Sequence, residues 1–258
     1  MKTESNKKMT DMILRRDNAS DIAYTYNVGE KELCLLYLHG WTAKRKTPKG
    51  NALETVAGRE GCPYLSLDYT GHGESGGEPM DFNIGQGIQD TLDVLEATVG
   101  DMPLLVIGNS IGGWIGLWLA EHLPQVRAFV GLAPAPDITQ FIWDKLLPES
   151  AKDTLARGET VGPSSETQGF CFTKHLFEDA EAHFMLNRPI QFNGISHLLI
   201  GDKDNQVGFD RVLQIKEKLT SDHVAITLIK GANHHLSRPQ DLSLIQKTVS
   251  EVIQEVSA

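Results

Sequence analysis

Short runs of apolar residues recur along the chain, with amphipathic segments between them. Two alternating stretches near the start and six continuous apolar runs predict eight β-strands: 12–16, 22–26, 33–38, 64–67, 104–107, 128–132, 195–200 and 224–229. Helices are expected near 48–60, 84–99, 111–122, 208–219 and 240–256. Strands that are apolar on both faces and alternate with helices are typical of parallel sheets. The pattern therefore predicts an α/β fold, in which helices cover both faces of a mostly parallel eight-stranded sheet.

The longest uncharged stretch, residues 102–120, has the length of a membrane span. Gly112 and Gly116 also have the spacing of a membrane-helix packing motif. A continuous helix is disfavoured, because Pro103, Gly108 and Gly113 would interrupt it and lipid offers no partner for a freed backbone group. We expect a buried strand at 104–107, a tight turn, and a buried helix at 111–122.

The chain between the strands at 128–132 and 195–200 is too long for an ordinary connection. Asp137 and Gln140 have capping-box spacing at the start of an apolar helix that Pro148 stops. Ser150 and Thr173 are expected to cap two further short helices. We predict a single domain over residues 1–258, with an inserted helical cap at approximately 135–193.

The composition is that of an ordinary globular protein with a formal net charge of −10. This charge disfavours attraction to nucleic acid or to anionic membrane surfaces. Three cysteines, Cys34, Cys62 and Cys171, lack CxxC or metal-ligand spacing, which favours reduced thiols. The polar start has no apolar signal segment. We expect a cytoplasmic protein without nucleic-acid partner or stable membrane insertion, and leave its oligomeric state open.

The turn between the strand at 104–107 and the helix at 111–122 carries the first candidate for chemistry. Residues 108–112 read G-N-S-I-G and satisfy G-x-S-x-G, a pattern that places a serine hydroxyl on a strained turn at a helix N-terminus. A phosphate-cradling loop or a plain tight turn are the alternatives, but this turn has neither a GxGxxG nor a GxxxxGK[ST] pattern. The spacing favours Ser110 as a nucleophile.

A serine nucleophile needs a base and a group that orients the base. Asp204 follows the strand at 195–200, and His234 follows the strand at 224–229. The order Ser, Asp, His, with each residue after a different strand, indicates a catalytic triad. The alternatives are a solvated DKDN turn and a surface histidine pair, His234 and His235.

The tetrahedral intermediate of such a reaction needs two N–H donors. One is expected from Ile111, the residue after the nucleophile, and the other from Trp41 in the loop that follows the strand at 33–38. His39 in the same loop is interpreted as structural, and the glycine-rich turn at 68–76 as a brace for neighbouring loops. The remaining histidines share no metal-ligand spacing, so neither a metal nor another cofactor is implied: His122, His175, His183, His197 and His223.

With these motifs the chain resembles the α/β-hydrolase superfamily over roughly residues 22–257. Three segments are similar to a group of mitochondrial palmitoyl-protein thioesterases, which also act as acyl-glucuronide esterases, and to its bacterial relatives: GNSIGGW at 108–114, APAPD at 133–137 and LIKGANHHLSRPQDL at 228–242. The resemblance implies an α/β-hydrolase fold. Asn233 stands where members of that group often carry an acidic residue, which bears on substrate preference. The chain has no transit-peptide pattern, so a bacterial-type cytoplasmic version is expected.

The predicted function is that of a serine esterase or thioesterase in the carboxylic ester hydrolase class, which cleaves small acyl substrates through an acyl-enzyme. A C–C bond hydrolase with the same triad is the alternative reaction, because fold alone does not set chemistry. A non-catalytic ligand-binding protein on the same fold is a further alternative.

The cap is expected to lie over the carboxyl ends of the strands and to cover the acyl pocket. Its candidate substrate-binding residues are apolar: Phe141, Ile142, Trp143, Leu146, Leu176 and Phe177. The alternative is that these side chains only attach the cap to the body. If they line the pocket, medium-chain acyl groups should be better substrates than acetyl.

Overall fold

One sheet of eight strands runs through the molecule in the order β1-β2-β4-β3-β5-β6-β7-β8. The structure is a computed structural model that describes residues 11–162 and 170–257. Its strands are β1 (Asp11–Leu14), β2 (Ile22–Asn27), β3 (Cys34–Leu38), β4 (Tyr64–Leu67), β5 (Leu104–Asn109), β6 (Val126–Leu132), β7 (Ile195–Gly201) and β8 (Val224–Ile229). Its helices are α1 (Pro48–Glu60), α2 (Ile84–Thr98), α3 (Ile111–His122), α4 (Ile138–Phe141), α5 (Glu149–Ala156), α6 (Lys174–Glu181), α7 (Phe209–Lys218) and α8 (Pro239–Val256), with a 3₁₀ turn η1 (Pro79–Asp81) and a π-helix η2 (Ile142–Leu146).

The sheet is mostly parallel, as the apolar runs predict. β1 pairs with β2 and β2 with β4 in antiparallel fashion, and all other neighbours are parallel. Every residue of β3, β4 and β5 is buried, which explains why these strands are apolar on both faces. The register pairs Leu38 with Gly108 and Asn109 with Leu132, so the segments after β3, β5 and β6 leave the sheet at one edge.

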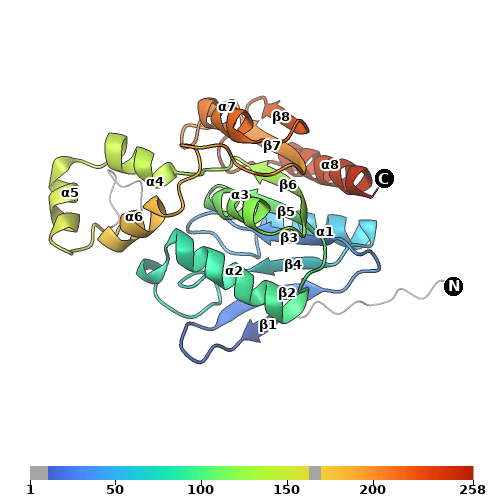
Figure 1. Cartoon of the computed structure of the whole chain (residues 1–258), viewed down its shortest axis with the longest axis horizontal. Helices are drawn as coiled ribbons and strands as arrows, with labels where there is room; N and C mark the ends of the chain where they lie inside the picture. Colours follow the sequence, from blue (N-terminus) through green and yellow to red (C-terminus); the bar gives the residue numbers. More distant parts are fainter. Residues whose placement is uncertain (1–10, 163–169, 258) are drawn as a thin grey trace.

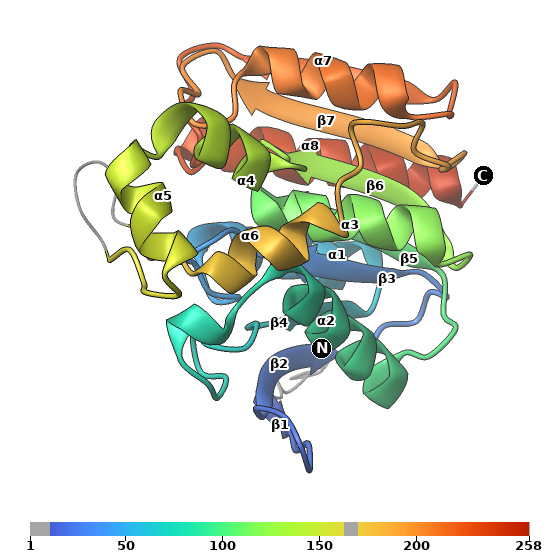
Figure 2. The same cartoon turned by 60° about the vertical axis from the view of Figure 1, so that its left-hand side comes forward.

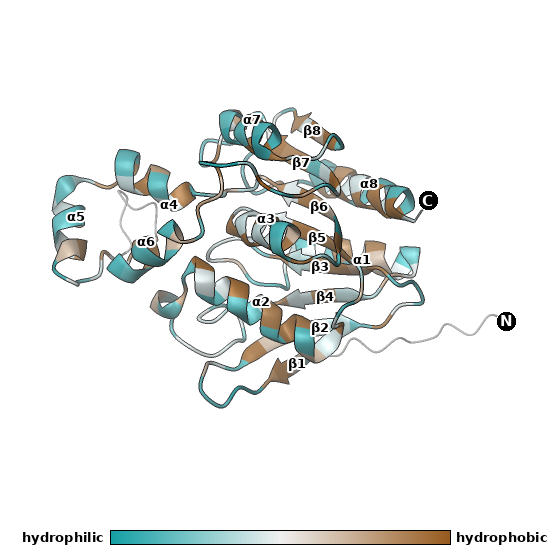
Figure 3. Ribbon diagram, in the orientation of Figure 1, coloured by the Kyte–Doolittle hydropathy of each residue, from teal (hydrophilic) through white to brown (hydrophobic). Residues whose placement is uncertain are grey.

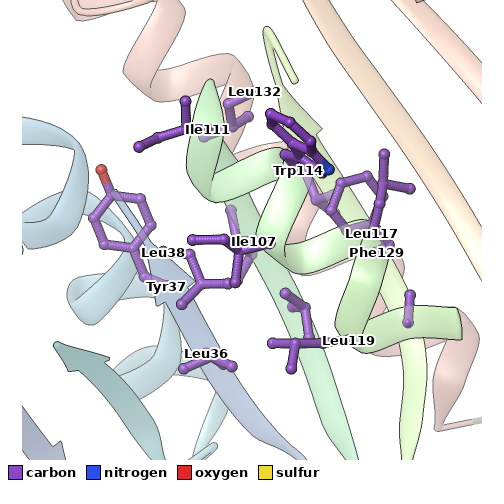
Figure 4. Close-up of a cluster of buried hydrophobic side chains, with 14 of the residues drawn as sticks. Leu36, Tyr37, Leu38, Ile107, Ile111, Trp114, Leu117, Leu119, Phe129 and Leu132 are labelled. Carbon is purple, nitrogen blue, oxygen red and sulfur yellow. The ribbon is translucent and has the colours of Figure 1, made fainter. Parts of the chain in front are cut away.

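Helices cover both faces of the sheet. α1 and α8 pack together on one face, and α2 and α3 lie on the other (Figure 2). The helices on the outside carry both hydrophilic and hydrophobic segments, as amphipathic helices do (Figure 3). The core between α3 and the central strands contains Leu36, Ile107, Trp114, Leu117 and Phe129 (Figure 4). This packing holds the start of α3 against the end of β5.

The uncharged stretch at 102–120 is divided as predicted. β5 ends at Asn109, Ser110 forms the turn, and α3 begins at Ile111. Within the described residues, no helix is both long enough and apolar enough to span a membrane.

The segment between β6 and β7 forms the helices α4, η2, α5 and α6. They lie together beyond the carboxyl ends of the parallel strands (Figure 1). Among the hydrogen bonds that connect this cap to the body, the Gly85 N–H donates to Asp179 Oδ2 at 2.8 Å, and the Trp114 indole N–H donates to the His183 carbonyl at 2.9 Å. The cap therefore has fixed contacts with both α2 and α3.

Of the three predicted helix caps in this segment, Thr173 is confirmed, Ser150 is wrong, and Asp137 is the N-cap residue of α4 but makes no side-chain capping hydrogen bond. Asp137 has left-handed backbone (φ 56°), and its carboxylate accepts from the N–H groups of Met185 and Leu186 instead of capping α4. These partners are distant in sequence, so no local pattern reveals them. Ser150 lies inside α5, whose N-cap is Pro148. Thr173 caps α6 as predicted, accepting from the Leu176 N–H at 3.1 Å.

Candidate active site

Ser110 occupies a strained turn between β5 and α3. Its backbone angles are φ 54° and ψ −119°, a combination that non-glycine residues rarely adopt and that marks functional turns. The two flanking positions have no room for a side chain. A Cβ at Gly108 would lie 2.3 Å from the Gly112 carbonyl oxygen, and a Cβ at Gly112 would lie 2.3 Å from the Leu38 carbonyl oxygen. The G-x-S-x-G pattern thus reflects close packing of the turn.

The three residues predicted to form a triad are joined by hydrogen bonds. His234 Nδ1 lies 2.8 Å from Asp204 Oδ2, and His234 Nε2 lies 3.1 Å from Ser110 Oγ. A carboxylate only accepts, so the imidazole proton belongs on Nδ1 and Nε2 accepts from the serine hydroxyl. His235 is exposed and has its ring 6.2 Å from that of His234, and no hydrogen bond links it to Ser110 or Asp204 in the described structure.

Asp204 is fixed in its charged form by its surroundings. Its side chain is fully buried, and Oδ1 accepts from the backbone N–H groups of Gln206 and Val207 at 2.9 and 3.0 Å. Burial alone raises the pKa of this carboxyl, but the hydrogen bonds from His234 and the two backbone groups outweigh burial and hold the pKa below its ordinary value. A charged Asp204 can orient the imidazole and stabilise it when it becomes protonated.

The two backbone groups predicted as oxyanion donors flank Ser110. Trp41, Ser110 and Ile111 line one pocket. In the described part of the chain, the N–H groups of Trp41 and Ile111 donate to no other protein group. The donor at Ile111 is free because it belongs to the first residue of α3, where the helix supplies no acceptor. Both groups are thus available to a negatively charged oxygen.

The two neighbouring loops have the structural roles expected from the sequence. His39 is fully buried, its Nδ1 lies 2.8 Å from the Gly40 carbonyl oxygen, and burial lowers its pKa to about 4. Asp68 accepts hydrogen bonds from the backbone N–H groups of Arg45 and Glu74, at 2.6 and 3.0 Å, and from the Arg45 guanidinium. Asp68 thereby ties the loop after β3 to the glycine-rich turn.

A pocket of about 130 Å³ opens beside Ser110 and His234. Most of its wall is apolar and comes from the cap: Ile138, Phe141, Ile142, Leu146, Leu147, Phe170 and Phe172. Asn205, Gln206 and Val207, which follow Asp204, also line it. Three of the six predicted cap residues, Phe141, Ile142 and Leu146, therefore face the pocket.

The other three, Trp143, Leu176 and Phe177, do not line this pocket, contrary to expectation. Trp143 and Phe177 pack against each other with ring centroids 5.0 Å apart and border a different depression, between α4 and α6. Leu176 is buried in the packing of the cap. Side chains of adjacent residues in a helix point in different directions, so Ile142 faces the pocket and Trp143 faces another side of the cap.

Phe170, Phe172 and Lys49 are site residues that the sequence analysis missed. The rings of Phe170 and Phe172 lie 4.9 and 5.8 Å from that of Trp41, which brings the far end of the cap onto the oxyanion loop. The F-C-F alternation at 170–172 is the only local signal for these two. Lys49 lies behind the serine turn, and its Nζ donates to Asn109 Oδ1 at 2.6 Å. Within residues 11–162 and 170–257, no group of three or more His, Cys, Asp or Glu side chains is placed to hold a metal ion.

The chain is similar to known proteins over nearly its whole length. Mitochondrial palmitoyl-protein thioesterase ABHD10 of Rattus norvegicus is 29% identical over 256 residues, which cover 97% of this chain and 85% of the relative. The crystal structure of a putative hydrolase from Agrobacterium vitis S4 is similar with a TM-score of 0.87 and 28% identity, over 95% of this chain and 98% of that one. The alpha/beta hydrolase domain-containing protein 10 from mouse gives a TM-score of 0.85 and 26% identity, over 96% and 99%.

The family model described as the alpha/beta hydrolase family matches residues 35–243, a span that includes Ser110, Asp204 and His234. The chain belongs to the alpha/beta hydrolase family.

Proposed function

We propose that this protein hydrolyses carboxylic esters or thioesters through a catalytic triad of Ser110, His234 and Asp204. The observation that carries the proposal is the hydrogen-bonded chain from Asp204 through His234 to Ser110 at the mouth of an apolar pocket. The similarity to a palmitoyl-protein thioesterase supports acyl transfer as the reaction class.

In the acylation step, Ser110 Oγ attacks the acyl carbon while His234 Nε2 takes the hydroxyl proton. Negative charge develops on the former carbonyl oxygen, and the N–H groups of Trp41 and Ile111 donate to it. His234 then gives the proton to the leaving oxygen or sulfur, and the bond from that atom to the acyl carbon breaks. The product of this half-reaction is an acyl ester on Ser110.

In the second half-reaction, water attacks the same carbon after His234 accepts one of its protons. The tetrahedral intermediate collapses, His234 returns the proton to Ser110 Oγ, and a carboxylic acid leaves. Asp204 remains charged throughout and stabilises the imidazolium that forms in each half-reaction. Every proton is thus moved by groups of this chain or by the water that is consumed.

The apolar lining of the pocket indicates that the protein recognises its substrate by an apolar acyl group. Phe141, Ile142 and Leu146 of the cap form part of a wall that offers hydrocarbon rather than hydrogen bonds. An acyl chain that enters it removes apolar surface from water on both sides. We also propose that the protein is cytoplasmic, whereas the Rattus norvegicus relative named above is mitochondrial.

The proposal is tested with matched oxygen and sulfur substrates. Purified protein is assayed against p-nitrophenyl esters and S-acyl thioesters of the same acyl chains, with Ser110→Ala as the control. We expect hydrolysis of both bond types by the wild-type protein and loss of nearly all turnover in the variant. Hydrolysis of neither bond type would contradict the proposed function.

A further inference from the structure

Lys49 is a buried cation that contacts no carboxylate among the described residues. It is the second residue of α1, and its side chain is nine-tenths buried, with only 6% of the residue exposed. Its one hydrogen bond in the described structure is the 2.6 Å bond to the neutral Asn109 side chain. Asp241 on α8 is the acid whose charge acts on it from a distance, and Asp241 itself is paired with Arg238.

This arrangement does not favour stability. Burial lowers the pKa of Lys49 to about 7, and a positive charge near a helix N-terminus opposes the helix dipole. A buried ammonium that meets only a neutral amide costs more than an apolar side chain of the same length would. The stability of the fold therefore does not explain why position 49 is a lysine.

The partner of Lys49 is part of the serine turn. Asn109 immediately precedes Ser110, and its Nδ2 donates to the Leu132 carbonyl at 2.9 Å. The same carbonyl accepts the Ser110 backbone N–H at 3.0 Å. The Asn109 side chain thus holds the turn against the end of β6 on one side and contacts Lys49 on the other.

Lys49 also belongs to the segment that carries the second oxyanion donor. The loop with Trp41 leads directly into α1, and its Gly40 lies against the serine turn, where a Cβ would be 3.3 Å from Ser110 Cβ and 3.4 Å from the Asn109 carbonyl oxygen. The contact between Lys49 and Asn109 therefore spans the two segments that supply Trp41 N–H and Ile111 N–H.

We propose that Lys49 is a positioning residue that holds the loop carrying Trp41 at a fixed distance from the turn carrying Ser110 and Ile111, through its hydrogen bond to Asn109. This inference rests on the proposed function. Lys49 lines no part of the pocket and touches no reacting atom. Its loss should therefore weaken stabilisation of the transition state and leave substrate binding in the apolar pocket unchanged.

The test is a double-mutant cycle with Lys49→Met, Asn109→Ala and the double variant, assayed for kcat and KM with p-nitrophenyl butyrate. Lys46→Met is the matched control. Lys46 lies on the same segment, its side chain is 38% exposed, and within the described residues its ion pairs are with Asp11 and Glu74 only. Thermal unfolding of each variant gives the folded fraction at the assay temperature. If Lys49→Met does not fold, Lys49→Leu, which also lacks a hydrogen-bond donor, takes its place in the same cycle.

We expect kcat of each single variant to fall about tenfold or more, while KM stays within about twofold of the wild-type value. The kcat of the double variant should be no lower than that of the worse single variant. Lys46→Met should keep the wild-type rate. A kcat within about twofold of wild type in a folded Lys49 variant overturns the inference, as do losses that multiply in the double variant or that equal the unfolded fraction. The Ser110→Ala control distinguishes a failure of this inference from a failure of the proposed function. If the wild-type protein hydrolyses the ester and the activity depends on Ser110, the proposed function stands even when the inference about Lys49 fails. If the wild-type protein does not hydrolyse the ester, the inference and the proposed function are both overturned.

Discussion

His234 Nε2 lies 3.1 Å from Ser110 Oγ although the two residues are 124 positions apart in the chain. The contact forms because Ser110 follows β5 and His234 follows β8, and both strands run parallel and end at one edge of the sheet. Proton transfer between these two atoms requires no rearrangement of the backbone.

The two adjacent histidines should differ sharply in their effect on activity. His234→Ala removes the group that accepts from Ser110, and we expect kcat/KM to fall about a thousandfold or more. His235→Ala should retain most activity, because this side chain is exposed and makes no hydrogen bond to Ser110 or Asp204 in the described structure. Steady-state rates of the two purified variants decide the matter, and the reverse ranking would assign the base to His235.

The two acidic residues after β7 provide a second matched pair. Asp204→Asn keeps the shape of the side chain but no longer selects the Nδ1–H tautomer of His234, so we expect kcat to fall about a thousandfold or more. Asp202 is exposed and accepts only the Gly231 N–H, at 2.5 Å, in the described structure, so Asp202→Asn should change kcat little. A larger loss in Asp202→Asn would move the orienting carboxylate to that position.

The strands, the helices of the body and the three residues Ser110, Asp204 and His234 were all predictable from local patterns. Apolar runs of strand length specify a buried parallel sheet, and parallel strands bring their carboxyl ends together wherever the residues lie in the sequence. Because Asp204 and His234 each follow a predicted parallel strand, the sequence alone was enough to predict that they lie near Ser110. The same logic predicted Trp41, after β3, as an oxyanion donor, and the structure has Trp41 and Ile111 lining the same pocket as Ser110.

The cap and the surroundings of the site were less predictable, because long-range contacts decide them. Asp137 carries a local capping pattern, but its carboxylate bonds the backbone at Met185 and Leu186. Trp143 is as apolar as Phe141, and only the turn of the π-helix directs it away from the pocket. Lys49 looks like the neighbouring Lys44 and Lys46 in sequence, and only the fold shows that it is the buried one.

The apolar pocket should set a preference for acyl chain length. Each methylene that it buries adds about 0.8 kcal/mol of binding, so kcat/KM should rise several-fold per carbon from acetyl until the pocket is full. Phe141→Ala should flatten this profile by removing part of the wall. Trp143→Ala, two residues further along, should leave the profile unchanged, because Trp143 borders a different depression. Rates over a series of p-nitrophenyl esters measure the profile, and a maximum at acetyl would exclude the cap wall from specificity.

Burial of Lys49 should give stability a defined pH dependence. Its pKa in the folded protein is about 7, below its ordinary value of 10.5, so between these values the unfolded chain binds more protons than the folded one. The contribution of Lys49 to the free energy of unfolding is therefore least favourable below about pH 7 and improves as pH rises toward 10.5. The melting temperature of Lys49→Met relative to wild type should be highest at pH 7 and below, and should decline at higher pH. A difference that is constant with pH would show that Lys49 has the same pKa in both states.

Covalent labelling by a fluorophosphonate probe, located by mass spectrometry of the digested protein, tests directly whether Ser110 is an activated nucleophile. An activated serine beside two oxyanion donors attacks phosphorus and displaces fluoride, whereas an ordinary serine does not react. We predict one probe per chain on the peptide that contains Ser110, with labelling abolished in Ser110→Ala and strongly slowed in His234→Ala. No labelling of the folded wild-type protein, or labelling that persists in Ser110→Ala, would show that Ser110 is not the nucleophile.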